Sequence, residues 1–197
     1  HAQFNMQSHP LFEFERTGEK LSSAKQLNVG VCDLNKAIEM NVLWHSVFPK
    51  IEASNCYRNK ICIAFACEFD GEFYASAIWT SPIAANRLKD GDKLLELRRM
   101  AICDKAPKYT ATRFLSIMQK HIKKKFPELT GLISYQDAEK HTGTIYKASN
   151  WVIDNKAEFS DWTTSTRKRA KSQSETPKIR WKYSMNSTGE KKEPSYQ

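Results

Sequence analysis

The stretch LLELRRMAICDKAPKYTATRFLSIMQKHIKKKFPELTGLISY, residues 94–135, holds a strand, a helix and a second strand in succession. The apolar run Leu94–Cys103 predicts a strand, although Arg98 and Arg99 interrupt it. Residues 110–126 place Phe114, Leu115, Met118 and Ile122 at helical spacing, and GLISY at 131–135 predicts the second strand. A strand, a helix and another strand in this order indicate a sheet with a helix packed on its face.

The sequence before this stretch predicts a hairpin preceded by a helix. KICIAFACEFDGEFYASAIWTSP, residues 60–82, has two strand-like runs around Asp70-Gly71, which predicts antiparallel strands at 60–69 and 72–80. A helix is expected from its N-cap, Asp33, to Pro49. Short strands are expected at Leu11–Thr17 and Val29–Cys32.

The sequence after this stretch predicts a short helix at His141–Ser149 and strands at Trp151–Ile153 and Lys178–Met185. The whole order indicates the α/β class, with a mixed central sheet that carries helices on its faces. Such a sheet binds ligands beyond the strand ends, where neighbouring strands diverge.

The 197 residues are enough for one domain with its own core, and the formal net charge is +9. Residues 164–182 contain seven Lys and Arg against one Glu, so this segment carries +6 of that charge. It is either a solvated linker or a contact for a phosphate backbone. The expected organisation is a lead-in with a short strand at 1–27, a folded core at 28–163, a basic arm with a terminal strand at 164–185 and a disordered polar tail at 186–197.

Composition also limits the compartment. No apolar stretch is long enough to span a membrane, and no secretion signal is visible, so we expect no membrane partner. The five cysteines form no CxxC pair and are interpreted as reduced core residues, which indicates the cytoplasm.

The order of elements resembles the GNAT acyl-CoA transferase fold over residues 28–185. The resemblance implies a mostly antiparallel central sheet that is splayed at its middle strands, with helices on both faces, and a catalytic core at 28–163. That resemblance implies a pyrophosphate-binding loop at Asp104–Arg113, before the helix at 110–126. The loop contains no glycine, unlike the usual family pattern. The candidate cofactor-binding residues are Lys108, Thr110, Thr112, Arg113 and Asn150, and simple helix capping is an equally good reading of the two threonines.

A narrower resemblance is carried by LELRRMAICDKAPKYTATRFLS, LISYQDAEKHTGTIYKASNWV and PKIRWKY, with WHSVFP and IWTSP upstream. In this order they resemble the phage Mom-type DNA adenine-modification proteins. The resemblance implies a phage-encoded enzyme in the bacterial cytoplasm that uses acetyl-CoA to add a methylcarbamoyl-type group to adenine N6 in double-stranded DNA, which protects phage DNA from restriction. Tyr109 and Thr112 depart from the expected Asn and Ser of the helix-opening turn.

The resemblance implies Tyr146, Asp137, His45 and Arg99 as catalytic residues. Tyr146 would protonate the departing CoA thiolate, and Arg99 would bind an anion of CoA or DNA. A buried structural tyrosine and a surface ion pair are the simpler readings of those two residues. His45 and Asp137 could converge with Tyr146 on a non-haem iron, or Asp137 could be the N-cap of the next helix.

Binding to DNA requires clustered cations, and reaching adenine N6 requires a flipped base between aromatic walls. The candidate cations are Arg167, Lys168, Arg169, Lys171, Arg180 and Lys182, and the candidate walls are Trp79, Tyr109, Trp151 and Trp181. Two other functions stay open. One is a conventional N-acetyltransferase acting on a peptide or small amine, and the other is a non-catalytic DNA-binding anti-restriction protein.

Overall fold

A computed structural model describes residues 17–44, 51–82, 93–137, 142–157 and 178–185. In these residues the strands are β1 (Asn28–Cys32), β2 (Cys62–Phe69), β3 (Glu72–Thr80), β4 (Leu94–Ile102), β5 (Gly131–Asp137), β6 (Val152–Ala157) and β7 (Lys178–Ser184). The helices are η1 (Ala24–Gln26), α1 (Leu34–Trp44), α2 (Ala53–Tyr57), α3 (Thr110–Lys125) and α4 (Thr144–Ala148). The strands form one sheet in the order β1-β2-β3-β4-β5-β7-β6.

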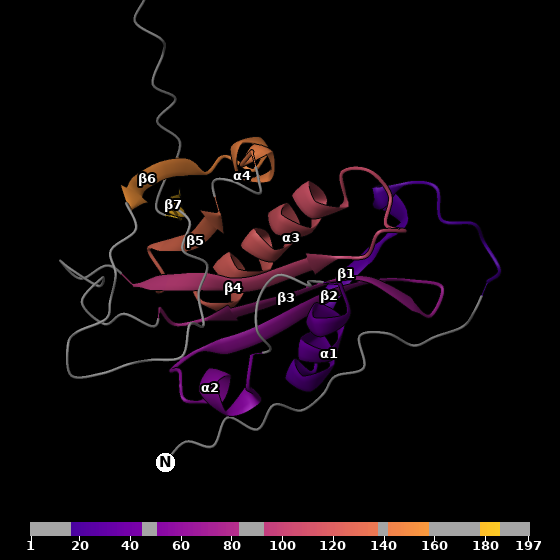
Figure 1. Ribbon diagram of the computed structural model, residues 1–197, viewed down its shortest axis with the longest axis horizontal. Helices are drawn as coiled ribbons and strands as arrows, with labels where there is room; N and C mark the ends of the chain where they lie inside the picture. Colours follow the sequence, from indigo (N-terminus) through magenta and orange to yellow (C-terminus); the bar gives the residue numbers. More distant parts are fainter. Residues whose placement is uncertain (1–16, 45–50, 83–92, 138–141, 158–177, 186–197) are drawn as a thin grey trace, which may run out of the picture.

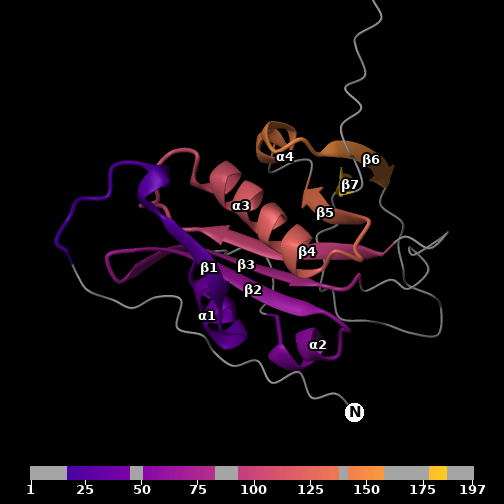
Figure 2. The same cartoon turned by 180° about the vertical axis from the view of Figure 1, so that it is seen from behind.

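Helices cover both faces of the sheet, which confirms the expected α/β layering. α3 and α4 lie on one side and α1 and α2 on the other, as both views show (Figures 1 and 2). The larger core lies on the α3 side, where Phe114, Leu115 and Met118 of α3 pack with Phe65 and Trp79 of the sheet. A smaller core beneath α1 is formed by Leu34, Ala37, Ile38, Ile51, Cys56, Ala64 and Ile78.

The predicted β2–β3 hairpin is confirmed at its turn. Asp70 and Gly71 have φ of 50° and 81°, and paired positive φ values suit a two-residue hairpin because the turn then follows the strand twist. The buried carboxylate of Glu68 accepts the Gly71 N–H at 2.6 Å and the Asn28 amide at 3.3 Å. The turn is thereby tied to β1.

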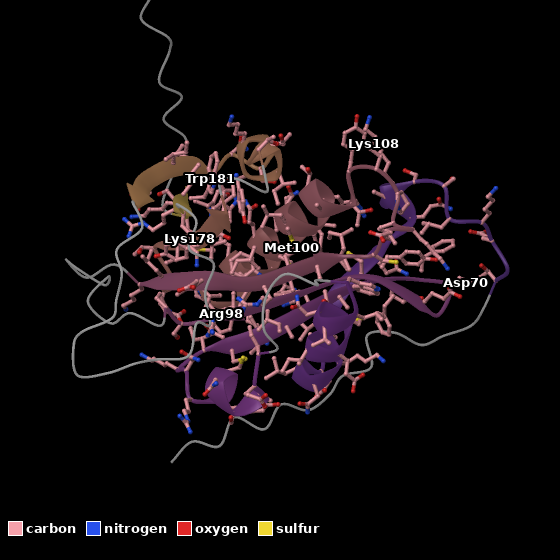
Figure 3. All side chains as sticks on the ribbon, in the orientation of Figure 1. Asp70, Arg98, Met100, Lys108, Lys178 and Trp181 are labelled. Atoms are coloured by element: carbon pink, nitrogen blue, oxygen red, sulfur yellow. The ribbon has the colours of Figure 1, made fainter. Side chains whose placement is uncertain are left out.

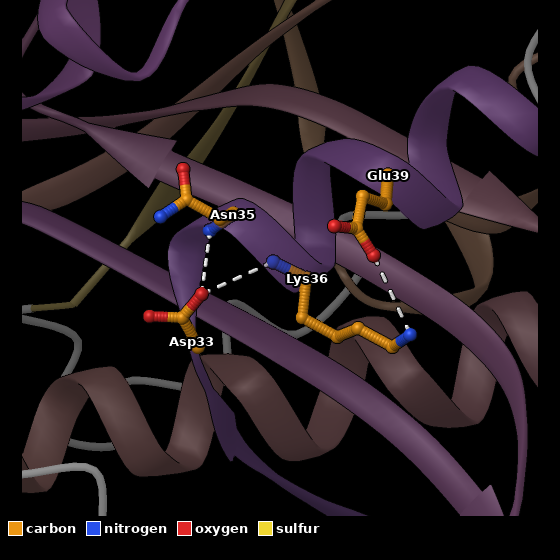
Figure 4. Close-up of polar contacts among 4 residues, drawn as sticks. All are labelled: Asp33, Asn35, Lys36 and Glu39. Carbon is orange, nitrogen blue, oxygen red and sulfur yellow. Dashed lines mark hydrogen bonds and ion pairs between the residues drawn. The ribbon is translucent and has the colours of Figure 1, made fainter.

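The predicted N-cap of α1 is also confirmed. The Asp33 carboxylate accepts the backbone N–H groups of Asn35 at 2.8 Å and Lys36 at 3.2 Å (Figure 4). These amides have no partner inside the helix, so the side chain compensates for an unmade bond. One turn later, Lys36 pairs with Glu39 at 3.5 Å.

The structure departs from the expected elements at two short helices. The short helix after β5 begins at Thr144 rather than His141, because its N-cap Gly143 adopts φ 73°. α2 was not expected from the sequence. The strand expected at Leu11–Thr17 falls almost wholly outside the described residues, as does the end of the first helix at Pro49. Of the helices described, none is long and apolar enough to cross a membrane.

Candidate active site

The sheet opens between β4 and β5, its one parallel pair among the described strands. Their pairing runs from Leu94 opposite Gly131 to Leu97 opposite Ser134 and then stops, although both strands continue. Beyond that point β5 stays bonded to β7 as far as Asp137. A sheet that splits at the carboxyl ends of parallel strands leaves backbone groups and side chains facing a ligand space.

An irregularity in β4 accompanies the opening. Ile78 of β3 lies opposite Arg99, whereas the next residue, Trp79, lies opposite Leu97, so Arg98 is an extra residue in β4. A bulge of this kind bends the strand and redirects its side chains. The arginines that interrupt the strand pattern therefore lie where β4 turns away from β5.

Tyr146 of α4 reaches the point where the strands separate. Its hydroxyl and that of Ser134, the last β5 residue paired with β4, lie 2.8 Å apart. Burial raises the pKa of Tyr146, and the Ser134 hydrogen bond opposes this in part. The phenol is therefore protonated at neutral pH and can act as a proton donor beside the split between the ends of β4 and β5.

Aromatic contacts hold the Tyr146 ring. It stacks on Trp181 of β7 at a centroid distance of 5.3 Å and meets Trp151 edge-on at 5.5 Å. The Trp181 indole N–H donates to Gln136 at 2.6 Å, and the Trp151 indole N–H donates to Gln119 at 3.0 Å. Figure 3 shows Trp181 between β7 and α4. The ring is thus positioned by Trp181 of β7 and by Trp151, which is itself bonded to α3.

The opposite side of the split is cationic. Arg98 lies on the α2 side of β4 and Met100 on the α3 side (Figure 3). Arg99 lies opposite Ile78, a residue of the smaller core, and its guanidinium donates to the Arg98 carbonyl at 2.8 Å. Burial and, secondarily, the charge of Arg98 lower the pKa of Arg99. Paired cations in a partly buried position suit an anionic ligand.

Glu96, a buried acid near these arginines, was not predicted from the sequence. It is only 7% exposed and lies opposite Thr80 and Ile133 in the neighbouring strands. Its charge acts on Arg99 in the direction that raises the pKa of the guanidinium. A glutamate within an apolar strand was the signal that could have identified it.

The start of α3 has the expected loop but different side-chain contacts. Tyr109, the N-cap, has φ 69° and makes no capping bond through its side chain. The Thr110 hydroxyl donates to the Pro107 carbonyl at 2.6 Å, and Arg113 donates to the Lys25 carbonyl at 3.5 Å. Lys108 lies over the Tyr109 ring at 5.2 Å, at the exposed end of the helix (Figure 3). The roles of these residues with a cofactor remain predictions.

Asn150 lies away from this loop. It has φ 62° and borders a cavity of about 160 Å³ between α3 and α4, together with Ser116, Lys120 and Lys123 of α3. Its predicted cofactor contact is untested.

Several predicted residues fall outside the described structure. His45, Arg167, Lys168, Arg169 and Lys171 lie in segments that are not described, as does the side chain of Asp137. In the described part of the chain, no group of three or more His, Cys, Asp or Glu side chains could hold a metal ion. The iron ligands therefore remain a prediction.

The remaining predicted residues have defined surroundings. Arg180 pairs with Asp154 of β6 at 2.5 Å, and Lys182 lies opposite Ile133 and Val152. Of the candidate aromatic walls, Trp79, Trp151 and Trp181 are buried in the larger core, whereas Tyr109 is 71% exposed. Those three indoles position other residues in the described structure and line no open surface.

In a comparison with known protein families, the model described as the Mom protein family matches residues 53–194. Among curated proteins, none matches the chain.

Solved structures that resemble this fold are acetyltransferases. The ribosomal-protein-S18-alanine N-acetyltransferase from Escherichia coli is 12% identical, with a TM-score of 0.56 over 84% of this chain and 97% of that one. The ribosomal-protein-S5-alanine acetyltransferase from Vibrio fischeri is 8% identical, with a TM-score of 0.59 over 89% and 97%. A GNAT family acetyltransferase from Elizabethkingia anophelis with acetyl-CoA bound is 11% identical, with a TM-score of 0.55 over 81% and 98%. These similarities confirm the expected GNAT-like fold.

Proposed function

This chain belongs to the Mom protein family, and we propose that it is a phage DNA-modification enzyme that uses acetyl-CoA to add a methylcarbamoyl-type group to adenine N6 in double-stranded DNA. The observation that carries the proposal is the Tyr146–Ser134 hydrogen bond at the point where β4 and β5 part. This contact supports the proposal because an acyl-transfer site requires a proton donor beside an opening in the sheet.

The residues at the split fit acetyl-CoA. The extended pantetheine arm would lie between the separated ends of β4 and β5 and bond to their exposed backbone groups. The pyrophosphate would lie at the N-terminus of α3, because the free amides of a first helical turn and the helix dipole attract anions. Lys108, Thr112 and Arg113 would contribute charge and a hydroxyl there. The cofactor supplies an acyl carbon activated as a thioester.

Tyr146 would act as the general acid. When the thioester bond breaks, the sulfur leaves with a negative charge, and a proton from the phenol makes it a better leaving group. Ser134 would orient the hydroxyl through their 2.8 Å contact. Stacking on Trp181 prevents the ring from turning away.

The arginine side of the split would face DNA. Arg99 and Arg98 would hold a phosphate next to the flipped adenosine, because a base inside a duplex must leave the stack to reach a protein pocket. The basic arm at 164–177 and Lys182 would add contacts to the backbone. Glu96 would orient Arg99 through its nearby charge.

Co-expression with a plasmid tests the proposal. The plasmid is digested to nucleosides and each of the four is weighed by mass spectrometry. We expect a new mass for deoxyadenosine alone. Four unmodified nucleosides from cells that contain abundant soluble protein would refute it.

A second candidate, N-acetylation of a peptide amine, is favoured by the fold shared with the two ribosomal-protein acetyltransferases. Purified protein would then release thiol from acetyl-CoA when an alanine-started peptide is added without DNA. The proposed function predicts no such release above background.

A further inference from the structure

A cationic cavity lies on the α3–α4 face, outside the split between β4 and β5. It has a volume of about 160 Å³ and is lined by residues of α3, of the end of α4 and of β7. Figure 1 shows α3 and α4 as neighbours on this face. The space would hold about five water molecules at roughly 30 Å³ each, which is enough for one phosphate group.

The floor of the cavity is built from fixed polar groups. Gln119 and Ser149 are 5% and 3% exposed. The Gln119 amide donates to the Ser149 carbonyl at 3.4 Å, while its oxygen accepts the Trp151 indole N–H at 3.0 Å. The Ser116 and Ser149 hydroxyls lie 3.5 Å apart. Two hydroxyl groups are thus held in place at the bottom of the cavity.

The rim is positively charged. Ser116, Gln119, Lys120 and Lys123 recur at helical spacing, so they share one stripe of α3. Both lysines are exposed, and Asn150 completes the rim from the turn after α4. In the described part of the chain, ion pairs join Lys36 to Glu39 and Arg180 to Asp154, and none involves a lysine of α3.

Two ammonium groups, an amide and two hydroxyls around one small space match the oxygens of a phosphate. We propose that this cavity binds a backbone phosphate of duplex DNA, at a second contact away from the reaction centre. The inference rests on the proposed function, because it takes DNA as the substrate. A duplex presents one charge per about 1.7 Å of its length, so a phosphate is available near any docked position.

The position of the cavity favours DNA over the 3′-phosphate of CoA. Lys120 and Lys123 follow Thr110 by ten and thirteen residues, which is about 15 and 20 Å along a helix. The pyrophosphate would lie at Thr110, and the ribose 3′-phosphate is only a few bonds from it. A CoA molecule bound in the split therefore does not bring a phosphate to Lys120 or Lys123.

The test measures duplex DNA binding by the purified full chain over a range of salt concentrations. The double variant Lys120→Gln with Lys123→Gln should bind about eightfold more weakly at 0.1 M salt, with a salt slope smaller by about one, because one phosphate contact is lost. The matched control, Lys124→Gln with Lys125→Gln, removes the same charge from the same helix outside the cavity and should change affinity less than threefold. Asn150→Asp, which adds an anion to the rim, should weaken binding as much as the double variant.

Three results overturn the inference while leaving the proposed function intact. In the first, wild type binds DNA and the cavity variants bind it with the same affinity. In the second, the control variant loses as much DNA affinity as the cavity variants, which would indicate a diffuse positive field on α3. The cavity variants could instead lose affinity for CoA relative to dephospho-CoA and none for DNA, which would assign the cavity to CoA. Failure of wild type to bind duplex DNA at all would refute the proposed function itself.

Discussion

Gly143→Ala tests how the proposed reaction centre around Tyr146 is held together. A Cβ at Gly143 would lie 2.5 Å from a ring carbon of Trp181 and 2.7 Å from the Gln136 side-chain oxygen, which are the two groups joined by the 2.6 Å hydrogen bond. Trp181 is also the ring on which Tyr146 stacks. The added methyl group must therefore displace Trp181, and with it the support of Tyr146.

The magnitude follows from three contributions. An L-residue at φ 73° costs about 1–2 kcal/mol, and overpacking a close-packed site costs about 1–3 kcal/mol. Breaking the buried hydrogen bond between Trp181 and Gln136 costs about 1–3 kcal/mol more. Together these reduce the free energy of unfolding by about 3–8 kcal/mol, and the melting temperature should fall by at least about 6 °C.

The chain offers a matched control in Gly18→Ala. Gly18 has φ 71°, and a Cβ there would meet nothing within 4 Å, so only the cost of the backbone conformation applies, about 1–2 kcal/mol. Urea unfolding followed by circular dichroism gives both free energies. Equal losses in the two variants would refute the account, because they would show that the Trp181 contact adds nothing.

Three further predictions concern single side chains. Tyr146→Phe should lower the yield of modified deoxyadenosine, measured by mass spectrometry, about 10²–10⁴-fold. Ser134→Ala removes the same hydrogen bond but keeps the phenol, so it should lower that yield less than tenfold. Burial, and then the charges of Lys125 and Lys124, lower the pKa of His121 below its usual 6.5. The neutral imidazole therefore contributes stability above pH 6.5, and this contribution is lost as the pH falls through the lowered pKa. The free energy of urea unfolding should accordingly change less between pH 7 and 5 in His121→Gln than in wild type. Arg180→Ala should weaken DNA binding less than threefold in a salt titration, because Arg180 is occupied by Asp154 in the free protein, and a larger loss would show that DNA displaces that pair.

Local sequence signals were enough for most of the fold. The Asp70-Gly71 turn, the Asp33 cap and the apolar spacing of α3 each act within a few residues, so they could be identified without a structure. α2 could not, because its sequence ASNCY has a single buried residue, Cys56, and no side-chain cap precedes it. Its burial comes from Cys56, which packs against Leu34 and Ile78 from distant parts of the chain.

The candidate site was predictable in its residues more than in its arrangement. Tyr146 could be found by its place after β5, but its contacts with Ser134 and Trp181 depend on how β5 pairs with β7. The three indoles expected as walls are core residues, because alternation in a strand does not distinguish a wall from a core face. The bulge at Arg98 depends on pairing with β3, and the sequence shows locally only that two arginines interrupt an apolar run.

The most direct test of the central claim is the mass of deoxyadenosine in plasmid DNA from cells that express either wild type or Tyr146→Phe at matched soluble levels. We predict a new deoxyadenosine mass with wild type and at most about one hundredth of it with Tyr146→Phe. Unmodified deoxyadenosine with wild type would contradict the DNA-modification function. Equal amounts of the new mass in both would contradict the placement of its chemistry at the β4–β5 split.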